Sequence, residues 1–216
     1  MRVSDRSPCG RPRGGAGARE PGEHASTPGG AATRRYRGGV STLPIRTFGD
    51  PVLHQVTTDI ENIDAKVAAL AESMIETMYK APGVGLAANQ IGVQKRLFVY
   101  DKGDGPVVVV NPRIVETSGE WAYEEGCLSV PGLSWEIVRP NEVHLVGRDL
   151  DGNEIDVQTE EFEGRIFQHE VDHLDGFLLI DRLDDDQRRA AKRALRKMQI
   201  RVAPHDHDGL HQLLGD

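Results

Sequence analysis

The sequence predicts an α+β fold. Two pairs of strand-like runs, 96–100 with 107–110 and 142–148 with 154–159, each flank a glycine-containing turn, and each pair indicates an antiparallel hairpin. Helical patterns lie before and after these runs. Because strands and helices are segregated along the chain rather than alternating, the pattern favours α+β over a parallel α/β sheet.

Three helices are expected. The first runs from Asp64, a suitable N-cap, to Lys80, because apolar residues recur there at a spacing of three and four. The second covers about 161–175 and is closed by Gly176, and the third covers 185–201.

The composition divides the chain into three parts. Residues 1–40 hold eight arginines against three acidic residues and almost no large apolar side chains, so we expect a disordered extension or an upstream start. Import into an organelle and tethering to nucleic acid are the alternatives. Residues 41–202 form the expected catalytic domain, and 203–216 a flexible polar tail.

The composition also bounds compartment and partners. The net charge of −8 argues against DNA as a partner of the whole domain, and no apolar run is long enough to predict a membrane span. No apolar stretch of a secretory signal follows the first basic residues. With only Cys9 and Cys127 in the chain, we expect a reducing compartment, the cytoplasm of a bacterial-type cell.

An H-E-x-x-H pattern lies in the second predicted helix. His169 and His173 are four residues apart, so both imidazoles can face one metal ion, and Glu170 can reach a bound water. The alternative is a pair of surface histidines. Apolar neighbours in this helix indicate burial, and buried histidines need partners, so we favour a metal site.

A third ligand is required for a catalytic ion. Downstream aspartates are available but have no recognisable spacing, whereas Cys127 lies upstream within Glu125–Ser129 and offers a thiolate, a strong ligand for Fe²⁺ or Zn²⁺. The alternative for a lone cysteine is a small buried apolar residue.

A further loop, 83–92, is rich in small residues and contains Gln90. It lacks the lysine of a phosphate-binding loop, which excludes that type of nucleotide site.

In this order, the three elements resemble the peptide deformylase family. Its pattern is G-x-G-x-A-A-x-Q, then E-G-C-L-S, then Q-H-E-x-D-H-x-x-G, and every fixed position matches at 83–90, 125–129 and 168–176. The resemblance covers roughly Leu43 to Arg182. It implies antiparallel sheets around the helix that carries H-E-x-x-H, and one divalent ion, Fe²⁺ natively, with Zn²⁺, Ni²⁺ or Co²⁺ possible.

The resemblance also implies an activity: removal of the formyl group from the N-terminal formylmethionine of nascent polypeptides, with release of formate. Metal-bound water would attack the formyl carbon, with Glu170 as general acid and base. The Gln90 amide and the Leu128 backbone N–H would stabilise the oxyanion. The implied metal ligands are Cys127, His169 and His173.

The methionine side chain needs an apolar pocket, for which Val84, Gly85, Phe162 and Ile166 are candidates; plain core packing is the alternative for each. Some family members carry an arginine near Ser134 that meets the peptide. This chain lacks it, and Arg139 either replaces it or forms a surface salt bridge. Asp172 either supports a metal ligand from outside the coordination sphere or is an ordinary acidic residue of the helix.

Two other functions compete with a deformylase. One is a non-catalytic protein with structural zinc, which has no use for Glu170 and lacks a fourth protein ligand. The other is an endopeptidase with a downstream acidic ligand. Separately, the basic helix 187–201 is a possible ribosome contact; a solvated face that balances the acidic domain is the alternative.

Overall fold

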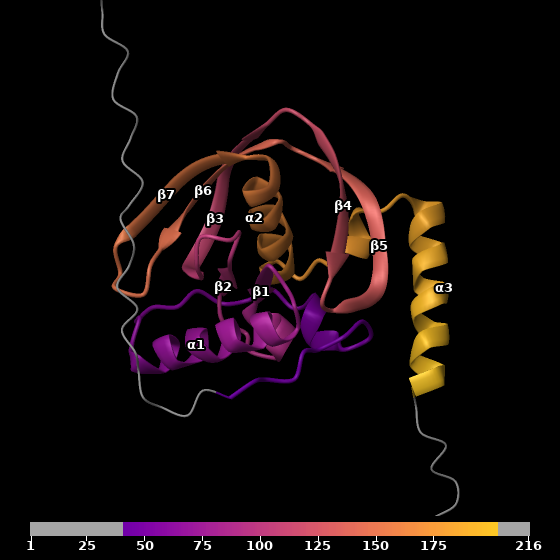
Figure 1. Cartoon of the computed structure of the whole chain (residues 1–216), viewed down its shortest axis with the longest axis horizontal. Helices are drawn as coiled ribbons and strands as arrows, with labels where there is room; N and C mark the ends of the chain where they lie inside the picture. Colours follow the sequence, from indigo (N-terminus) through magenta and orange to yellow (C-terminus); the bar gives the residue numbers. More distant parts are fainter. Residues whose placement is uncertain (1–40, 203–216) are drawn as a thin grey trace, which may run out of the picture. The chain divides into compact units, whose positions relative to one another are not determined.

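The computed structural model describes residues 41–202 (Figure 1). The predicted extension, 1–40, and tail, 203–216, lie outside the described residues and stay predictions. Within the described part, the α+β prediction is confirmed. A five-stranded antiparallel sheet has the order β1 (Gly85–Ala87), β2 (Leu97–Tyr100), β3 (Val107–Ser118), β6 (Glu142–Arg148) and β7 (Glu154–Glu160).

A separate two-stranded sheet and six helical segments complete the domain. The sheet pairs β4 (Trp121–Cys127) with β5 (Val130–Arg139). The α-helices are α1 (Ala65–Lys80), α2 (Glu161–Leu174) and α3 (Asp185–Val202), and the 3₁₀ turns are η1 (Pro51–His54), η2 (Ala88–Ile91) and η3 (Leu179–Arg182). In Figure 1, α2 lies between the large sheet and the β4–β5 hairpin, and α3 lies beyond β5.

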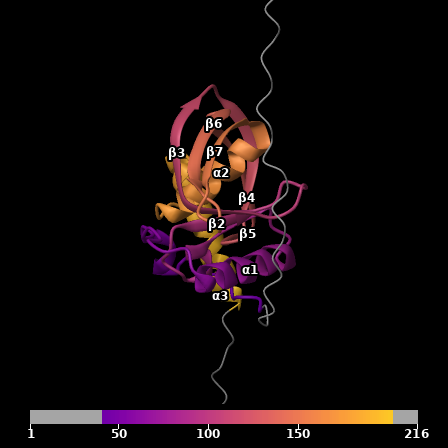
Figure 2. The ribbon, with the colours of Figure 1, turned by 90° about the vertical axis from the view of Figure 1, so that its left-hand side faces the viewer.

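Helix α1 forms as its sequence predicts. Asp64 accepts hydrogen bonds from the backbone N–H groups of Lys66 and Val67, which satisfies two of the free donors at the N-terminus. The buried face includes Met74 and Met78, which pack against β1 and β2 in one apolar cluster. This packing supports β1 and η2 beneath the site, and the turned view in Figure 2 shows α1 on that side.

The large sheet packs against α2 through a second apolar cluster. Phe98, Tyr100 and Phe167 form its aromatic part, and the Tyr100 and Phe167 rings meet edge to face with centroids 5.2 Å apart. Gly164 lets α2 approach β6, since a Cβ there would lie 3.2 Å from the Cγ2 atom of Val143. The apolar face of α2 is therefore fixed on the sheet, which leaves another face for chemistry.

The β4–β5 hairpin was not predicted. Residues 130–135 open its second strand, β5. Gly126, Pro131 and Gly132 interrupt the strand pattern, and few side chains of either strand are fully buried. The hairpin gains its support on one side from α3, where Val130 and Ile137 share a third apolar cluster with Ala191 and Leu195.

The other predicted strands and helices are also confirmed. Both predicted hairpins are confirmed as β2–β3 and β6–β7, although β3 extends eight residues beyond its expected end at Val110. Helices α2 and α3 match their predicted ranges to within one residue. Within residues 41–202, every helix is too short or too polar to cross a membrane.

Candidate metal centre and active site

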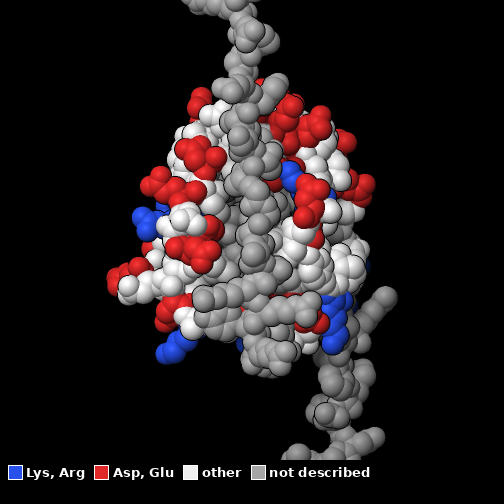
Figure 3. Space-filling view, turned by 60° about the vertical axis from the view of Figure 1, so that its left-hand side comes forward, with Lys and Arg blue, Asp and Glu red and all other residues white. Residues whose placement is uncertain are grey.

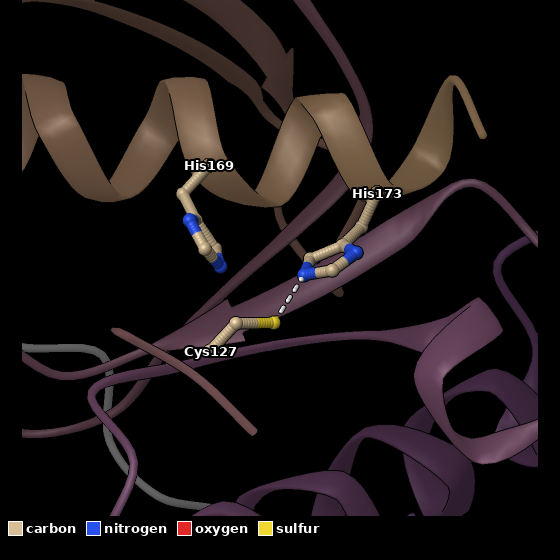
Figure 4. A group of neighbouring side chains, drawn as sticks. All are labelled: Cys127, His169 and His173. Carbon is tan, nitrogen blue, oxygen red and sulfur yellow. Dashed lines mark hydrogen bonds between the residues drawn. The ribbon is translucent and has the colours of Figure 1, made fainter. Parts of the chain in front are cut away.

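The structure brings the three predicted metal ligands together (Figure 4). His169 and His173 lie one turn apart on α2, and Cys127 ends β4. Their ligand atoms all lie within 4.8 Å of one another, and the Cys127 Sγ atom is 3.2 Å from His173 Nε2. A thiolate and two imidazoles at this spacing suit one divalent transition-metal ion.

Glu125 holds His169 in place from the side opposite the ligand cluster. Its carboxylate oxygen Oε2 lies 3.0 Å from His169 Nδ1. An acceptor at Nδ1 fixes a proton there and leaves Nε2 as the lone pair for an ion. Burial alone would raise the pKa of Glu125, but the hydrogen bonds from His169 and Arg139, together with the charge of Arg139, hold it well below its usual range.

Two buried arginines neutralise Glu125. Arg139 donates from Nε and Nη2 at 2.7 and 3.0 Å, and Arg165 donates from Nη1 at 2.8 Å. The side chains of Arg139 and Arg165 are 6% and 3% exposed, so the alternative of a surface salt bridge for Arg139 is wrong. The Arg139 side chain extends from β5 toward α2. Two buried carboxylates lie there, and they require a cation nearby.

The second carboxylate of that pair is Asp172. It accepts a hydrogen bond from Arg139 Nη1 at 2.6 Å and is also bonded by Arg182. With 8% of its surface exposed, Asp172 is not an ordinary exposed acid. It links α2 to β5 through Arg139, which also binds the carboxylate that contacts His169.

Glu170 lines the cavity, and one of its carboxylate oxygens is buried there. It is 4% exposed, and its Oε2 atom has no partner among the described residues. Burial raises the pKa of this carboxyl to about 7, where it can both take and give a proton near neutral pH. Gly85 makes room for it: a Cβ atom at that position would overlap Glu170 Oε1 and lie 2.8 Å from Cδ.

Gln90 and Leu128 border the same space. Gln90 Oε1 accepts from the Ala87 backbone N–H at 2.8 Å, which orients Nε2 toward Ser129 Oγ at 3.1 Å and the Cys127 sulfur at 3.8 Å. Leu128 follows Cys127 directly, in the turn between β4 and β5, and lines the same cavity. Both residues line the cavity beside the ligand cluster, and their role as oxyanion donors stays a prediction.

A cavity of about 660 Å³ opens beside the cluster. All four predicted pocket residues line it: Val84, Gly85, Phe162 and Ile166. Ile166 is buried, whereas Val84 and Phe162 are partly exposed at 47% and 37%, so the latter two are not plain core residues. The volume is typical of a site for a small ligand or a short peptide segment.

The sequence reasoning missed several residues that build the site. Glu125 of β4 was identified only as part of a motif. Arg165 of α2 was not identified at all. Asn89 was also missed; its side-chain amide donates to the His173 backbone carbonyl and ties η2 to α2. The sequence did offer one signal for Arg165: it is a charged residue one turn before His169 on the same helix face.

Substituting Gly85 tests how closely β1 approaches Glu170. Gly85→Ala should lower the free energy of unfolding by about 1–3 kcal/mol, because the new methyl group would lie 2.8 Å from Glu170 Cδ and 3.1 Å from Cγ and would force the buried side chain to shift. Gly126→Ala is the matched control, since a Cβ there meets nothing within 4 Å. Denaturant unfolding should separate the two variants; equal stabilities would contradict the close approach.

Comparisons with known proteins agree with this geometry. The family model described as polypeptide deformylase matches residues 42–189. A peptide deformylase of Clostridium botulinum is 48% identical over 138 residues, 64% of this chain and 94% of the relative. One from Chlorobaculum parvum is 42% identical over 180 residues, 76% of this chain and 95% of the relative.

Solved structures show the same likeness. The crystal structure of a peptide deformylase from Legionella pneumophila superposes with a TM-score of 0.71 at 37% identity, covering 76% of this chain and 99% of that one. A peptide deformylase from Ehrlichia chaffeensis in complex with actinonin gives a TM-score of 0.71 at 34% identity, covering 76% and 99%. On the family match, the shared fold and the assembled site, this chain belongs to the polypeptide deformylase family of hydrolases.

Proposed function

We propose that this protein is a metal-dependent hydrolase that removes the formyl group from the N-terminal formylmethionine of nascent polypeptides and releases formate. The observation that carries the proposal is the convergence of Cys127, His169 and His173 beside the buried, unpartnered oxygen of Glu170. Among the described residues, no downstream aspartate joins the ligand cluster, which argues against the endopeptidase alternative.

The donor set fits a catalytic ion. The ligands would be Cys127 Sγ with one nitrogen from each imidazole, and the Glu125 carboxylate presets the tautomer of His169. We propose Fe²⁺ as the native ion; Zn²⁺, Ni²⁺ and Co²⁺ suit the same ligands. When bound, a divalent ion lowers the pKa of a coordinated water from 15.7 toward ~7 and polarises the carbonyl of the substrate. Metal analysis of protein purified without oxygen tests the identity of the ion.

Glu170 moves the proton. The residue lines the cavity, its buried Oε2 atom has no partner within residues 41–202, and its raised pKa suits it to accept a proton from the attacking water and to return it to the leaving amine. The Gln90 Nε2 and Leu128 backbone donors would meet the negative charge that develops on the formyl oxygen. The loss of one such donor typically costs ~10²–10³ in kcat.

The cavity would bind the methionine side chain. Ile166 and Phe162 on α2, with Val84 and Gly85 on the other wall, supply an apolar lining close to the metal ligands. Transfer of a methionine side chain from water to such a lining is favourable. The proposed substrate therefore meets the ion and the apolar pocket at the same time.

Helix α3 is the proposed contact with the ribosome. Its buried residues Ala191 and Leu195 anchor it to the domain, and its exposed basic side chains are Arg189, Arg193, Arg196 and Lys197. Acidic side chains predominate on the face of the domain drawn in Figure 3, and the basic surface of α3 contrasts with that face. Action on chains that leave the ribosome places the protein in the cytoplasm in this proposal; organellar import through 1–40 stays a minor alternative.

Replacing Cys127 tests the ligand assignment. Cys127→Ser should weaken metal binding at least ~10²-fold, because an alcohol is a far poorer ligand than a thiolate. Metal per chain after dialysis measures this, with Cys9→Ser as the matched cysteine control. A fully loaded Cys127→Ser protein would remove Cys127 from the ligand set.

Replacing Glu170 tests the proton transfer and the function together. Glu170→Gln should keep the metal but release formate from a formylmethionyl peptide at least ~10²-fold more slowly, because an amide cannot accept the proton. The exposed Glu161→Gln on the same helix is the control. Absence of formate release by the native, metal-loaded protein would overturn the proposed function, and a fully active Glu170→Gln would overturn only the role of Glu170.

Removing the basic surface of α3 tests the ribosome contact. Changing Arg189, Arg193, Arg196 and Lys197 to Gln should reduce co-sedimentation with ribosomes at low salt, since phosphate contacts are lost, and leave turnover of a free formylmethionyl peptide constant. A control variant changes four exposed lysines elsewhere, Lys66, Lys80, Lys95 and Lys102. Equal sedimentation of the two variants would exclude α3 as the tether.

A further inference from the structure

The two histidines of the proposed metal centre are supported differently. Each has one ring nitrogen in the ligand cluster, and Figure 4 shows that the second nitrogen of His173 points away from Cys127. The Nδ1 atom of His169 lies 3.0 Å from the Glu125 carboxylate. The Nδ1 atom of His173 is buried and makes no hydrogen bond to any of residues 41–202. Direct contact with a protein group therefore orients the first ring but not the second.

A ligand imidazole needs an acceptor at its outer nitrogen. When Nε2 binds a metal ion, Nδ1 carries the proton and is a hydrogen-bond donor. Ligand histidines almost always donate this N–H group to a carboxylate, a carbonyl or a water. A buried N–H group without an acceptor is costly. Because His173 is only 1% exposed, its ring requires an acceptor inside the protein.

One buried oxygen is held at the same residue. Three buried side-chain oxygens have no partner in the part of the chain that the structure describes: Asn89 Oδ1, Gln94 Oε1 and Glu170 Oε2. Glu170 lines the cavity, where the proposed chemistry uses it. The amide of Gln94 donates to the Val52 backbone carbonyl of η1 at 3.1 Å. The amide of Asn89 donates instead to the backbone carbonyl of His173 itself. Asn89 therefore offers the free acceptor that is tied to the residue in need of one.

A single water can join the two groups. Asn89 lies on η2 and is 0% exposed, so bulk water does not satisfy its oxygen. The amide is short and planar, and its nitrogen contacts residue 173, so its oxygen lies near that residue as well. The oxygen and the His173 Nδ1 atom do not bond directly. Two buried polar groups that are close but beyond direct reach are typically bridged by an ordered water.

We propose that Asn89 is a positioning residue of the metal centre, whose Oδ1 atom accepts the hydrogen bond of His173 Nδ1–H through one buried water. The Asn89 amide then holds His173 twice, by its backbone carbonyl and by its ring. The inference rests on the proposed function, because it concerns the ion that this function requires. It also couples two parts of the site, since Asn89 directly precedes Gln90 on η2.

Two variants of equal shape test the polar role of Asn89. Valine and threonine differ in one group, and only the threonine hydroxyl can both donate and accept a hydrogen bond. Asn89→Val should weaken zinc binding by the full chain about 10–100-fold, the usual effect of losing the partner of a ligand histidine, whereas Asn89→Thr should stay close to the native affinity. Competition with a chelator measures the affinities. Gln94→Met removes the other buried amide and should leave the affinity unchanged.

Nuclear magnetic resonance distinguishes support of the ring from a merely structural role. In the zinc-loaded full chain with isotope-labelled histidine, the Nδ1–H proton of His173 should show contact with a long-lived water. The Nδ1–H proton of His169 should not, because its acceptor is the Glu125 carboxylate. Asn89→Val should shift or broaden the His173 signal and leave the His169 signal in place. A general loosening of the site would change both signals.

The outcomes separate this inference from the proposed function. Equal zinc affinities of Asn89→Val and Asn89→Thr would overturn the role of Asn89, and so would a His173 signal that changes only in Gln94→Met. Absence of the water contact in the native chain would overturn it as well, and this measurement decides the matter if Asn89→Val does not fold. A native chain that binds zinc but releases no formate would overturn the proposed function alone. A native chain that binds no zinc would overturn both.

Discussion

The pairing of one buried carboxylate is the constraint on which the rest of the site depends. Glu125 shares its two oxygens among His169, Arg139 and Arg165, which come from α2 and β5. An isolated carboxylate at this depth would be strongly destabilising, and removal of one partner of such a pair typically costs about 3–5 kcal/mol. The hairpin can therefore close over α2 only in the register that satisfies Glu125, and that register also delivers Cys127 to the two histidines.

Helix α2 divides its circumference among three tasks. Phe167, Val171 and Leu174 pack on the large sheet, and His169 and His173 face Cys127. A further set, Arg165 and Asp172, reaches the β4–β5 hairpin through ion pairs. Because a helical turn holds 3.6 residues, a short segment can serve the core, the chemistry and the attachment of the hairpin at once. This is why so few side chains of α2 are exposed despite its polar composition.

Local patterns account for what the sequence could predict. Some features depend on only a few neighbouring residues and can be predicted without the tertiary structure. They are the periodicity of α1, the capping by Asp64 and the turns of both regular hairpins. The H-E-x-x-H spacing likewise fixes the two histidines on one face. Cys127 could be predicted as a ligand only from its motif, because no local spacing relates a strand end to a helix about forty residues later.

Long-range compensation accounts for what the sequence could not predict. Arg139 continues the alternation of Leu133, Trp135 and Ile137 on the inward face of β5, but this pattern does not reveal its partners Glu125 and Asp172, which lie 14 and 33 residues away along the chain. Gly126, Pro131 and Gly132 interrupt the strand pattern near the turn of the hairpin, and its alternating residues Leu133, Trp135 and Ile137 are covered by η3 and α3. Such elements become visible only once the partners that satisfy them are in place.

The three ligands of the proposed metal centre come from two different apolar clusters. His169 and His173 lie on α2, whose core residues belong to the apolar cluster of the large sheet. Cys127 packs at the edge of a different apolar cluster, which the hairpin, η3 and α3 form. Local opening of proteins occurs in cooperative units of this kind. A chain in which only one unit has folded presents either two imidazoles or one thiol, so the complete ligand set exists only after both units have formed, and opening of either unit is a route by which the ion can leave.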